Sequence, residues 1–258
     1  MARDLLVLSG GHPYEAEPFA AMLESLDGWT VTHLIHPEAE RLVGEGRADD
    51  ADAMLFYDMP GYTFADGQVT ARLPSEAFRR AIMARFAAGR GAVAMHHALA
   101  GWALWPEWSE LLGGRFLYEP GDVRGVPQLD SGYRHDVSYT AQVVAEHPVT
   151  AGLPETFEVT DELYLARVFA EDFVPLIRAQ HNFAAANFYS AAAAVAGRMF
   201  DNTGWDHSPG NACVAWAKQA LAARLVYLQF GDGPATYANP NVRRVLANAL
   251  DYVASPQD

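Results

Sequence analysis

Two adjacent histidines, His96 and His97, follow an apolar run in the segment AVAMHHALAGW, residues 92–102. The run has the composition of a buried β-strand, and the small residues after the pair are typical of a turn that opens a helix. In an open α/β sheet, ligands bind beyond the carboxyl ends of the strands. We expect one imidazole to face a pocket and its neighbour to face the packing, since adjacent strand residues point to opposite sides. The alternative is a pair that only caps a strand.

Other predicted strand ends carry polar side chains as well. His12 follows the first apolar run and its glycines, Tyr57 and Asp58 end the third, and Asp232 follows the last. Because the carboxyl ends of parallel strands meet at one rim of a sheet, these groups predict a polar pocket there. The alternative for the glycines near His12 is a plain tight turn, because neither common phosphate-binding glycine pattern is present.

Three loop segments add further candidates, DSGYRHD (130–136), VTDELYL (159–165) and DNTGWDHSPGN (201–211). They supply polar and aromatic groups close together in sequence, and tryptophans follow the histidine pair. An aromatic cleft with carboxylates and imidazoles suits a carbohydrate, because sugar C–H faces pack on rings while hydroxyls bind the polar groups. Solvated loops are the alternative. The aromatic residues in question are Trp102, Trp105, Trp108, Tyr133, Tyr164 and Trp205.

We assign roles to these residues as expectations. The expected catalytic residues are His96, His97, Glu162 and His207. A divalent ion, zinc or manganese, is one option, with His96, Glu162 and His207 as ligands. No local signature such as HExxH supports it, and acid–base catalysis without a metal is the alternative. The expected substrate-binding residues are His12, Tyr57, Asp58, Trp102, Tyr133, His135, Tyr164, Trp205 and Asp232.

Short apolar runs alternate with segments of helical spacing, which predicts an α/β fold with a parallel sheet covered by helices on both faces. Residues 113–165 are rich in glycine, proline and aspartate and predict a loop or β insertion on one domain spanning 1–258. We expect helices at 14–26, 75–89 and 241–255. We expect strands at 5–10, 29–35, 52–58 and 91–97, and the parallel rhythm to return at 174–178, 191–197, 212–217 and 224–231.

The composition excludes several classes of protein. The formal net charge is −14 and no basic cluster is visible, which argues against nucleic-acid binding. The single cysteine, Cys213, excludes an internal disulfide and lies in an apolar run, so we expect a buried thiol rather than a nucleophile. The first apolar run is too short for a signal peptide or a membrane span, and we expect a cytoplasmic protein.

Several strings resemble the ThuA-like (trehalose utilisation) family: HHALAGWALWPEWSELLGGRF, DSGYRHDVSY, HPVTAGLPETFEVTDELYL and GDGPATYANPNVRRVLANAL. The resemblance runs from LVLSGGH to the final helix. It implies a class I glutamine amidotransferase-like, flavodoxin-like α/β fold that is doubly wound and mostly parallel. It also implies a link to carbohydrate utilisation, with disaccharides or their keto derivatives as substrates.

The family pattern marks particular positions of this chain. It matches His12, His96, His135, Glu162 and His207, and also His147, where the following proline favours a structural role. Two departures matter. Met95–His96–His97 stands where glutaminases of this fold carry a cysteine nucleophile, so thiolate chemistry is not expected. Gly231–Asp232 stands where many relatives have Gly-His.

These observations predict an enzyme acting on a sugar, disaccharide or keto-sugar by His/Glu proton transfer, as an isomerase, lyase or hydrolase. Its partner is a small-molecule carbohydrate, with no nucleic acid and no membrane. A non-catalytic sugar-binding or regulatory module and a metal-dependent amide or ester hydrolase are the alternatives. A homo-oligomer is left open, because the aromatic loop 102–108 suits an interface equally well.

Overall fold

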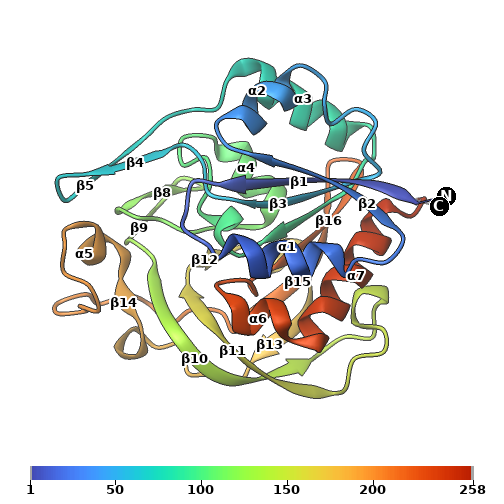
Figure 1. The fold of residues 1–258 in the computed structure, drawn as a ribbon. Helices are drawn as coiled ribbons and strands as arrows, with labels where there is room; N and C mark the ends of the chain where they lie inside the picture. The colour runs from blue at the N-terminus through green and yellow to red at the C-terminus, as the bar shows by residue number, and fades with distance from the viewer. Residues whose placement is uncertain (1, 257–258) are drawn as a thin grey trace.

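The computed structural model describes residues 2–256, and a ten-stranded sheet runs through this part of the chain (Figure 1). Its strands are β1 (Arg3–Gly10), β2 (Trp29–Ile35), β3 (Ala53–Asp58), β6 (Ala92–Met95), β10 (Gly132–Val143), β11 (Thr156–Leu165), β13 (Val174–Ala179), β14 (Tyr189–Ser190), β15 (Cys213–Ala220) and β16 (Ala223–Leu228). The order is β11-β10-β13-β15-β16-β6-β3-β1-β2, and β14 pairs with β10.

Three small antiparallel pairs lie outside the sheet: β4 (Tyr62–Ala65) with β5 (Gln68–Ala71), β7 (Gly114–Arg115) with β12 (Arg167–Val168), and β8 (Gly121–Val123) with β9 (Val126–Gln128). The α-helices are α1 (Ala16–Glu24), α2 (Glu38–Gly44), α3 (Glu76–Ala87), α4 (Pro106–Leu112), α5 (Ala191–Val195), α6 (Pro234–Ala238) and α7 (Pro240–Ala254). Short 3₁₀ turns cover His96–Leu99, Pro148–Thr150, Ala170–Asp172 and Ala185–Asn187.

Strand β1 shows why the sheet is buried on both faces. Leu5 and Val7 pack in the core layer that contains α1 and α7, whereas Leu6 and Leu8 pack in the layer that contains α2, α3 and α4. Alternate residues of a strand point to opposite faces, so a strand covered on both sides must be apolar throughout. Figure 1 shows α2, α3 and α4 on one side of the sheet and α1, α6 and α7 on the other.

The helix boundaries follow ordinary capping chemistry. The predicted helix 75–89 is α3, and the side chain of Ser75 accepts a hydrogen bond from the Phe78 amide at its start. The closing helix is α7, capped by Asn239. Its predicted apolar face is confirmed, with these residues buried: Val242, Val245, Leu246, Ala249, Leu250 and Val253.

The doubly wound α/β class is confirmed, with two local corrections. Strands β2, β1, β3, β6 and β16 are parallel neighbours, but β13, β15 and β16 pair antiparallel, so the expected parallel rhythm over 174–178 and 212–217 is wrong. Only two residues join β15 to β16, and so short a connection permits an antiparallel pair alone.

The strand expected at 191–197 is also wrong, because this segment forms α5. Alanine is the strongest helix former, and the Ser190 side chain accepts a hydrogen bond from the Ala193 amide at the helix start. The expected insertion at 113–165 is a sheet extension in its second half, since β10 and β11 continue the main sheet. Among the described residues, no helix combines the length and the apolar character that a membrane span requires.

Candidate functional site

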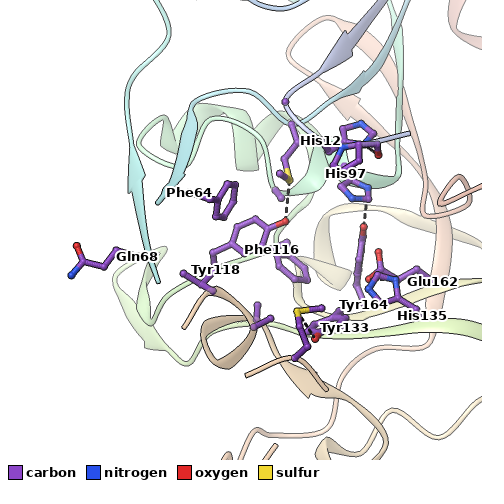
Figure 2. A pocket seen from close by; sticks show the side chains of 18 of the residues that line it. His12, Phe64, Gln68, His97, Phe116, Tyr118, Tyr133, His135, Glu162 and Tyr164 are labelled. Atoms are coloured by element: carbon purple, nitrogen blue, oxygen red, sulfur yellow. Dashed lines mark hydrogen bonds and ion pairs between the residues drawn. The ribbon is translucent and has the colours of Figure 1, made fainter. Parts of the chain in front are cut away.

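A pocket of about 520 Å³ lies where the parallel strands of the sheet end (Figure 2). Its polar end collects side chains from four separate segments of the chain, and its other walls are largely apolar, with Asp66 and Gln68 of the hairpin among them. The hairpin β4–β5 and the segment around α5 form those walls. The polar residues at the first end are His12, His97, His135, Glu162 and Tyr164, and the larger apolar and aromatic residues are Met59, Phe64, Phe116, Tyr118, Tyr133, Val195 and Met199.

The two adjacent histidines lie on a 3₁₀ turn, because β6 already ends at Met95. Their rings lie side by side, with centroids 4.3 Å apart, so they do not alternate across a strand. The expected division, with one ring at the pocket and one in the packing, is nevertheless present. His97 lines the pocket, whereas His96 is fully buried behind it. His96 has a φ of +49°, and its Nδ1 donates to the carbonyl oxygen of Gln229 over 2.5 Å. This bond directs Nε2 toward the carboxylates.

Two carboxylates face the His96 imidazole. The Nε2 atom lies 3.3 Å from Glu162 Oε2 and 3.6 Å from Asp232 Oδ1. On their outer side, His135 Nδ1 lies 3.2 Å from Glu162 Oε1 and 3.7 Å from Asp232 Oδ2. Glu162 is buried in β11, and Asp232 follows β16. The predicted convergence is therefore present for these four residues. His96 and Asp232 were expected at strand ends, whereas His135 and Glu162 were expected in loops and lie in β10 and β11.

Asp161, the residue before Glu162, holds the loop that carries Asp232. Its two carboxylate oxygens accept hydrogen bonds from the amides of Gly231 (2.8 Å) and Asp232 (2.9 Å). The side chain is buried, and burial raises the pKa of Asp161 to about 6. The sequence segment 159–165 contains both residues, but only Glu162 was assigned a role there. Because strand residues alternate, one points to the pocket and the other to the opposite face.

Tyr164 links the two histidines. Its hydroxyl lies 2.9 Å from His96 Nε2 and 3.2 Å from His97 Nδ1. His12 stacks on the other face of His97, with ring centroids 4.2 Å apart, and its Nε2 donates to the backbone carbonyl of Tyr57. Figure 2 shows His12, His97 and Tyr164 close together at one side of the pocket, and the buried ring of His96 lies behind them.

The electrostatic environment separates the pKa values of neighbouring imidazoles. Burial disfavours the charge on His96, but hydrogen bonding to Asp232 and Glu162 outweighs it and raises the pKa to about 10. Burial lowers the pKa of His97 well below its ordinary value, and the charges of His96 and His12 lower it further. The carboxylate of Asp232 raises the pKa of His135. Burial raises the pKa of Asp232, but hydrogen bonds from His135 and His96 outweigh this effect and lower the pKa below its ordinary value.

Three of the expected substrate-binding residues have structural contacts and do not line the pocket. The hydroxyl of Tyr57 donates to the carbonyl of Gly231 (2.8 Å), which ties two strand ends together. Asp58 is fully buried and pairs with His36 over 2.8 Å. Trp102 is fully buried against Phe78. Their strand-end and loop positions were predicted correctly, but their side chains pack into the core.

His207 and Trp205 also lie apart from the pocket lining. Trp205 donates from Nε1 to Asp130 Oδ1 (3.1 Å), and the His207 ring packs beside it with Nδ1 donating to the Ser208 carbonyl. The structure does not bring His207 to His96 and Glu162, so the expected catalytic and metal-binding grouping with His207 is wrong. The loop is held to Asp130 rather than to the sheet rim.

The tryptophans after the histidine pair are core residues. Trp102, Trp105 and Trp108 are at most 2% exposed, so these three side chains do not form a sugar platform. The interface considered for residues 102–108 stays a prediction, and Leu104 is the exposed apolar residue of that segment. The rings that line the pocket instead include Phe64, Phe116 and Tyr118, which sequence reasoning missed. The sequence gives little indication that these three aromatic residues line a pocket, because no polar motif lies beside them.

Cys213 and His147 have the structural roles expected of them. Cys213 is buried, and burial raises the pKa of its thiol to about 11. The Nδ1 atom of His147 accepts a hydrogen bond from the Val149 amide and caps a short 3₁₀ turn.

Four residues of the described chain could hold a metal ion: His96, His97, Glu162 and Asp232, with one potential ligand atom each and all four atoms within 4.8 Å of one another. His96 and Glu162 were expected in such a site. His97 and Asp232 take the place that was expected for His207.

Comparisons with known proteins agree with this fold. The family model described as ThuA, trehalose utilisation, matches residues 10–253. A ThuA-like protein of Parabacteroides merdae is similar over 99% of this chain and 91% of its own, with a TM-score of 0.70 and 15% identity. A ThuA-like protein of Bacteroides uniformis is similar over 97% of this chain and 91% of its own, with a TM-score of 0.62 and 18% identity.

A third solved structure, described as a cytoplasmic protein of Salmonella typhimurium, is similar over 97% of this chain and 98% of its own, with a TM-score of 0.60 and 12% identity. At these identities the likeness shows the fold alone. A search of curated protein sequences finds no match.

Proposed function

Since this chain belongs to the ThuA family of trehalose utilisation, we propose that it is an enzyme acting on a neutral sugar or sugar derivative by proton transfer. The observation that carries the proposal is the convergence of His97, His135 and Glu162 at one end of a pocket with aromatic walls. Each of these groups can exchange a proton with a bound substrate. The reaction class is isomerisation, elimination or hydrolysis.

The charge of the pocket favours a neutral substrate. Among the described residues that line it, there is no lysine or arginine, whereas Glu162 and Asp66 are acidic. Phosphate and carboxylate groups are bound in most sites by arginine, lysine or a helix N-terminus. A sugar phosphate or sugar acid would therefore meet acidic side chains without a lysine or arginine to bind it, and a neutral sugar or keto-sugar fits better.

The walls favour a ligand with apolar C–H faces. Phe116, Tyr118 and Tyr133 line the pocket next to the polar end. Aromatic rings pack against the C–H faces of sugars, while the hydroxyl groups bind imidazole and carboxylate groups. We assign proton transfer to His97, His135 and Glu162, and a positioning role to His96, which contacts Glu162 from behind the pocket surface.

The test uses the full-length protein with neutral disaccharides, trehalose among them, and their keto derivatives in D₂O. Proton NMR follows product formation and exchange of carbon-bound hydrogens with solvent. We expect turnover of at least one such compound and a loss of at least tenfold in kcat for His135→Gln. The control His147→Gln changes a histidine remote from the pocket and keeps the wild-type kcat.

Binding of these sugars without turnover or exchange would overturn the proposal in favour of a non-catalytic binding module. Preferred turnover of phosphorylated sugars would overturn the neutral substrate class. The expected cytoplasmic location is part of the same proposal, and fractionation of cells expressing the full-length protein tests it.

A further inference from the structure

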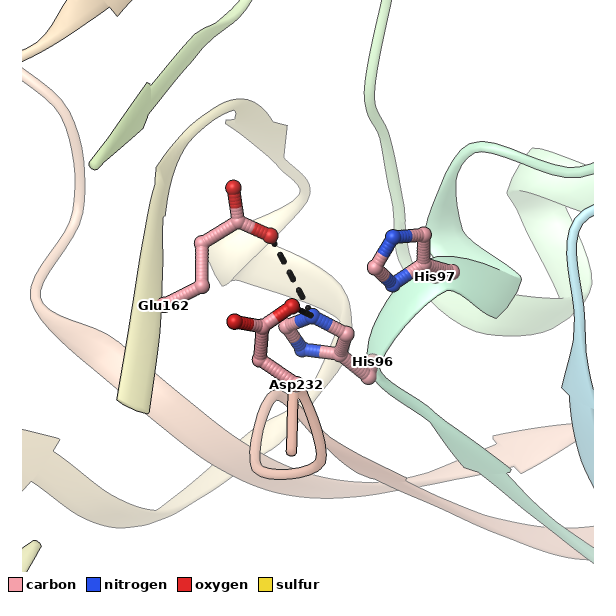
Figure 3. Close-up of side chains that lie close together, drawn as sticks. All are labelled: His96, His97, Glu162 and Asp232. Atoms are coloured by element: carbon pink, nitrogen blue, oxygen red, sulfur yellow. Dashed lines mark ion pairs between the residues drawn. The ribbon is translucent and has the colours of Figure 1, made fainter. Parts of the chain in front are cut away.

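The side chains of His96, His97, Glu162 and Asp232 point toward one centre (Figure 3). We infer that this centre binds a divalent cation of the zinc or manganese class. The four residues come from a 3₁₀ turn after β6, from β11 and from the loop after β16, so the fold brings together segments 65 or more residues apart in sequence, as His97 and Glu162 show. The inference concerns the same pocket as the proposed function but is measured without any sugar.

The donor atoms suit such a cation. Two imidazoles and two carboxylates form an acceptable ligand set for zinc or manganese. Their atoms all lie within 4.8 Å of one another. The separations of His96 Nε2 from the two carboxylates, 3.3 and 3.6 Å, are longer than a charge-assisted hydrogen bond of about 2.8 Å. Two ligands that each lie about 2.1 Å from one ion are separated by roughly 3.0–3.5 Å.

The surroundings hold these donors in place. The Nδ1 atom of His96 is already bonded to the Gln229 carbonyl, the outer contact that metal-bound imidazoles make in most sites. Asp161 fixes the loop of Asp232 through two backbone amides. His135 contacts the outer oxygen of Glu162. A preformed outer layer of this kind orients ligands for a metal, and a pair of core histidines would not need it.

The charge at the centre also calls for a cation. Glu162 and Asp161 are 4% exposed, and Asp232 adds a third carboxylate. Within the described residues, the ion-pair partners of Glu162 and Asp232 are His96 and His135, and no lysine or arginine pairs with them. Buried carboxylates need compensating positive charge. Protonated His96 and His135 supply it when no metal is bound, and a divalent cation supplies it while His96 and His97 bind as neutral ligands.

The position of the centre gives the cation access to substrate. His97 and Glu162 also line the pocket, so a sugar oxygen placed there reaches the same centre. A bound zinc or manganese ion polarises a carbonyl or two neighbouring hydroxyl groups, which promotes proton removal from the adjacent carbon. The cation would thus select sugars with a carbonyl or a vicinal diol at the reacting end.

The experiment uses the full-length protein after treatment with a chelator and gel filtration. Isothermal titration with ZnCl₂ and with MnCl₂ should show one bound ion per chain for at least one metal. We expect Asp232→Asn and Glu162→Gln each to weaken that affinity by at least tenfold. The matched control Asp206→Asn alters an exposed carboxylate outside the cluster and keeps the affinity. Circular dichroism verifies that each variant is folded.

A second measurement does not depend on the variants. Binding to the folded state alone must raise the melting temperature of the wild-type protein as the metal concentration rises. Binding at less than one ion per chain, or equal affinities in the control and the two cluster variants, would overturn the inference. Sugar turnover that persists at the full rate in chelated protein without detectable metal would overturn it and leave the proposed function standing. Metal binding without any sugar turnover would support the inference and overturn the proposed function.

Discussion

Replacing Asp161 by alanine tests how the site is held together. The change leaves the buried amides of Gly231 and Asp232 without their acceptor. An unpaired buried donor costs about 1–3 kcal/mol, so two cost about 2–6 kcal/mol. Burial raises the pKa of Asp161 to about 6, which shows that its charge is costly to bury, and removing the charge recovers part of the loss. We therefore expect Asp161→Ala to lower the free energy of unfolding by about 2–4 kcal/mol.

Asparagine at the same position keeps one acceptor oxygen but points an amide donor at the second N–H. We expect about half the effect of alanine, roughly 1–2 kcal/mol. Urea unfolding followed by tryptophan fluorescence measures both variants, since the chain has six tryptophans. Asp206→Asn serves as the surface control, expected within about 0.5 kcal/mol of wild type. An Asp161→Ala protein as stable as this control would refute the view that the carboxylate holds the Asp232 loop.

Three other predictions are independent of that one. Tyr164→Phe removes the hydroxyl between the two imidazoles but keeps the ring, so we expect kcat for the sugar substrate to fall at least tenfold with KM within threefold; an unchanged kcat would contradict a role for the hydroxyl. Gly11→Ala should lower the free energy of unfolding by about 2–4 kcal/mol, because Gly11 has a φ of +86° and a Cβ there would lie 2.2 Å from the carbonyl oxygen of Met59. Urea unfolding measures this, and an unchanged unfolding midpoint would contradict it. Burial raises the pKa of the Cys213 thiol to about 11, so the reactive thiolate is scarce at pH 8 and grows only as the pH approaches 11. A disulfide reagent should therefore label native protein slowly at pH 8 and urea-unfolded protein quickly, and equal rates would contradict the buried placement.

The fold was predictable wherever a single rule governs the sequence. Apolar runs such as residues 5–10 can only be strands buried on both faces, and the serine before residue 76 starts a helix in the expected way. The strand pairing was less accessible. Whether β13 and β15 run parallel or antiparallel depends on how the intervening chain crosses the sheet, and local periodicity carries no information about that path.

Composition misled the prediction at one segment. Residues 191–197 contain five alanines and one valine, which reads as apolar, yet alanine favours a helix once a serine caps it. The error matters for the site, because α5 and the residues after it form one wall of the pocket.

The site was predictable at strand ends and in part elsewhere. His135 and Glu162 were expected in loop segments and lie in β10 and β11 within the site, whereas His207 was misplaced. His97 and Asp232 follow strands whose carboxyl ends meet at one rim, so topology alone brings them together. His207 lies in a long loop whose position is set by tertiary contacts such as the bond from Trp205 to Asp130. Asp58 ends a strand as expected, but its side chain faces His36 inside the protein, since the strand-end rule places the backbone and leaves the direction of the side chain open.

The hairpin β4–β5 and the α5 segment surround the pocket mouth, whereas the histidines and carboxylates sit on the sheet rim itself. Neither the hairpin nor the α5 segment forms a strand pair with the central strands β1, β3 and β6. Insertions, deletions or substitutions in these two segments can therefore occur without displacing the histidines and carboxylates on the sheet rim. The size and shape of the pocket can therefore change while the polar residues on the sheet rim keep their positions.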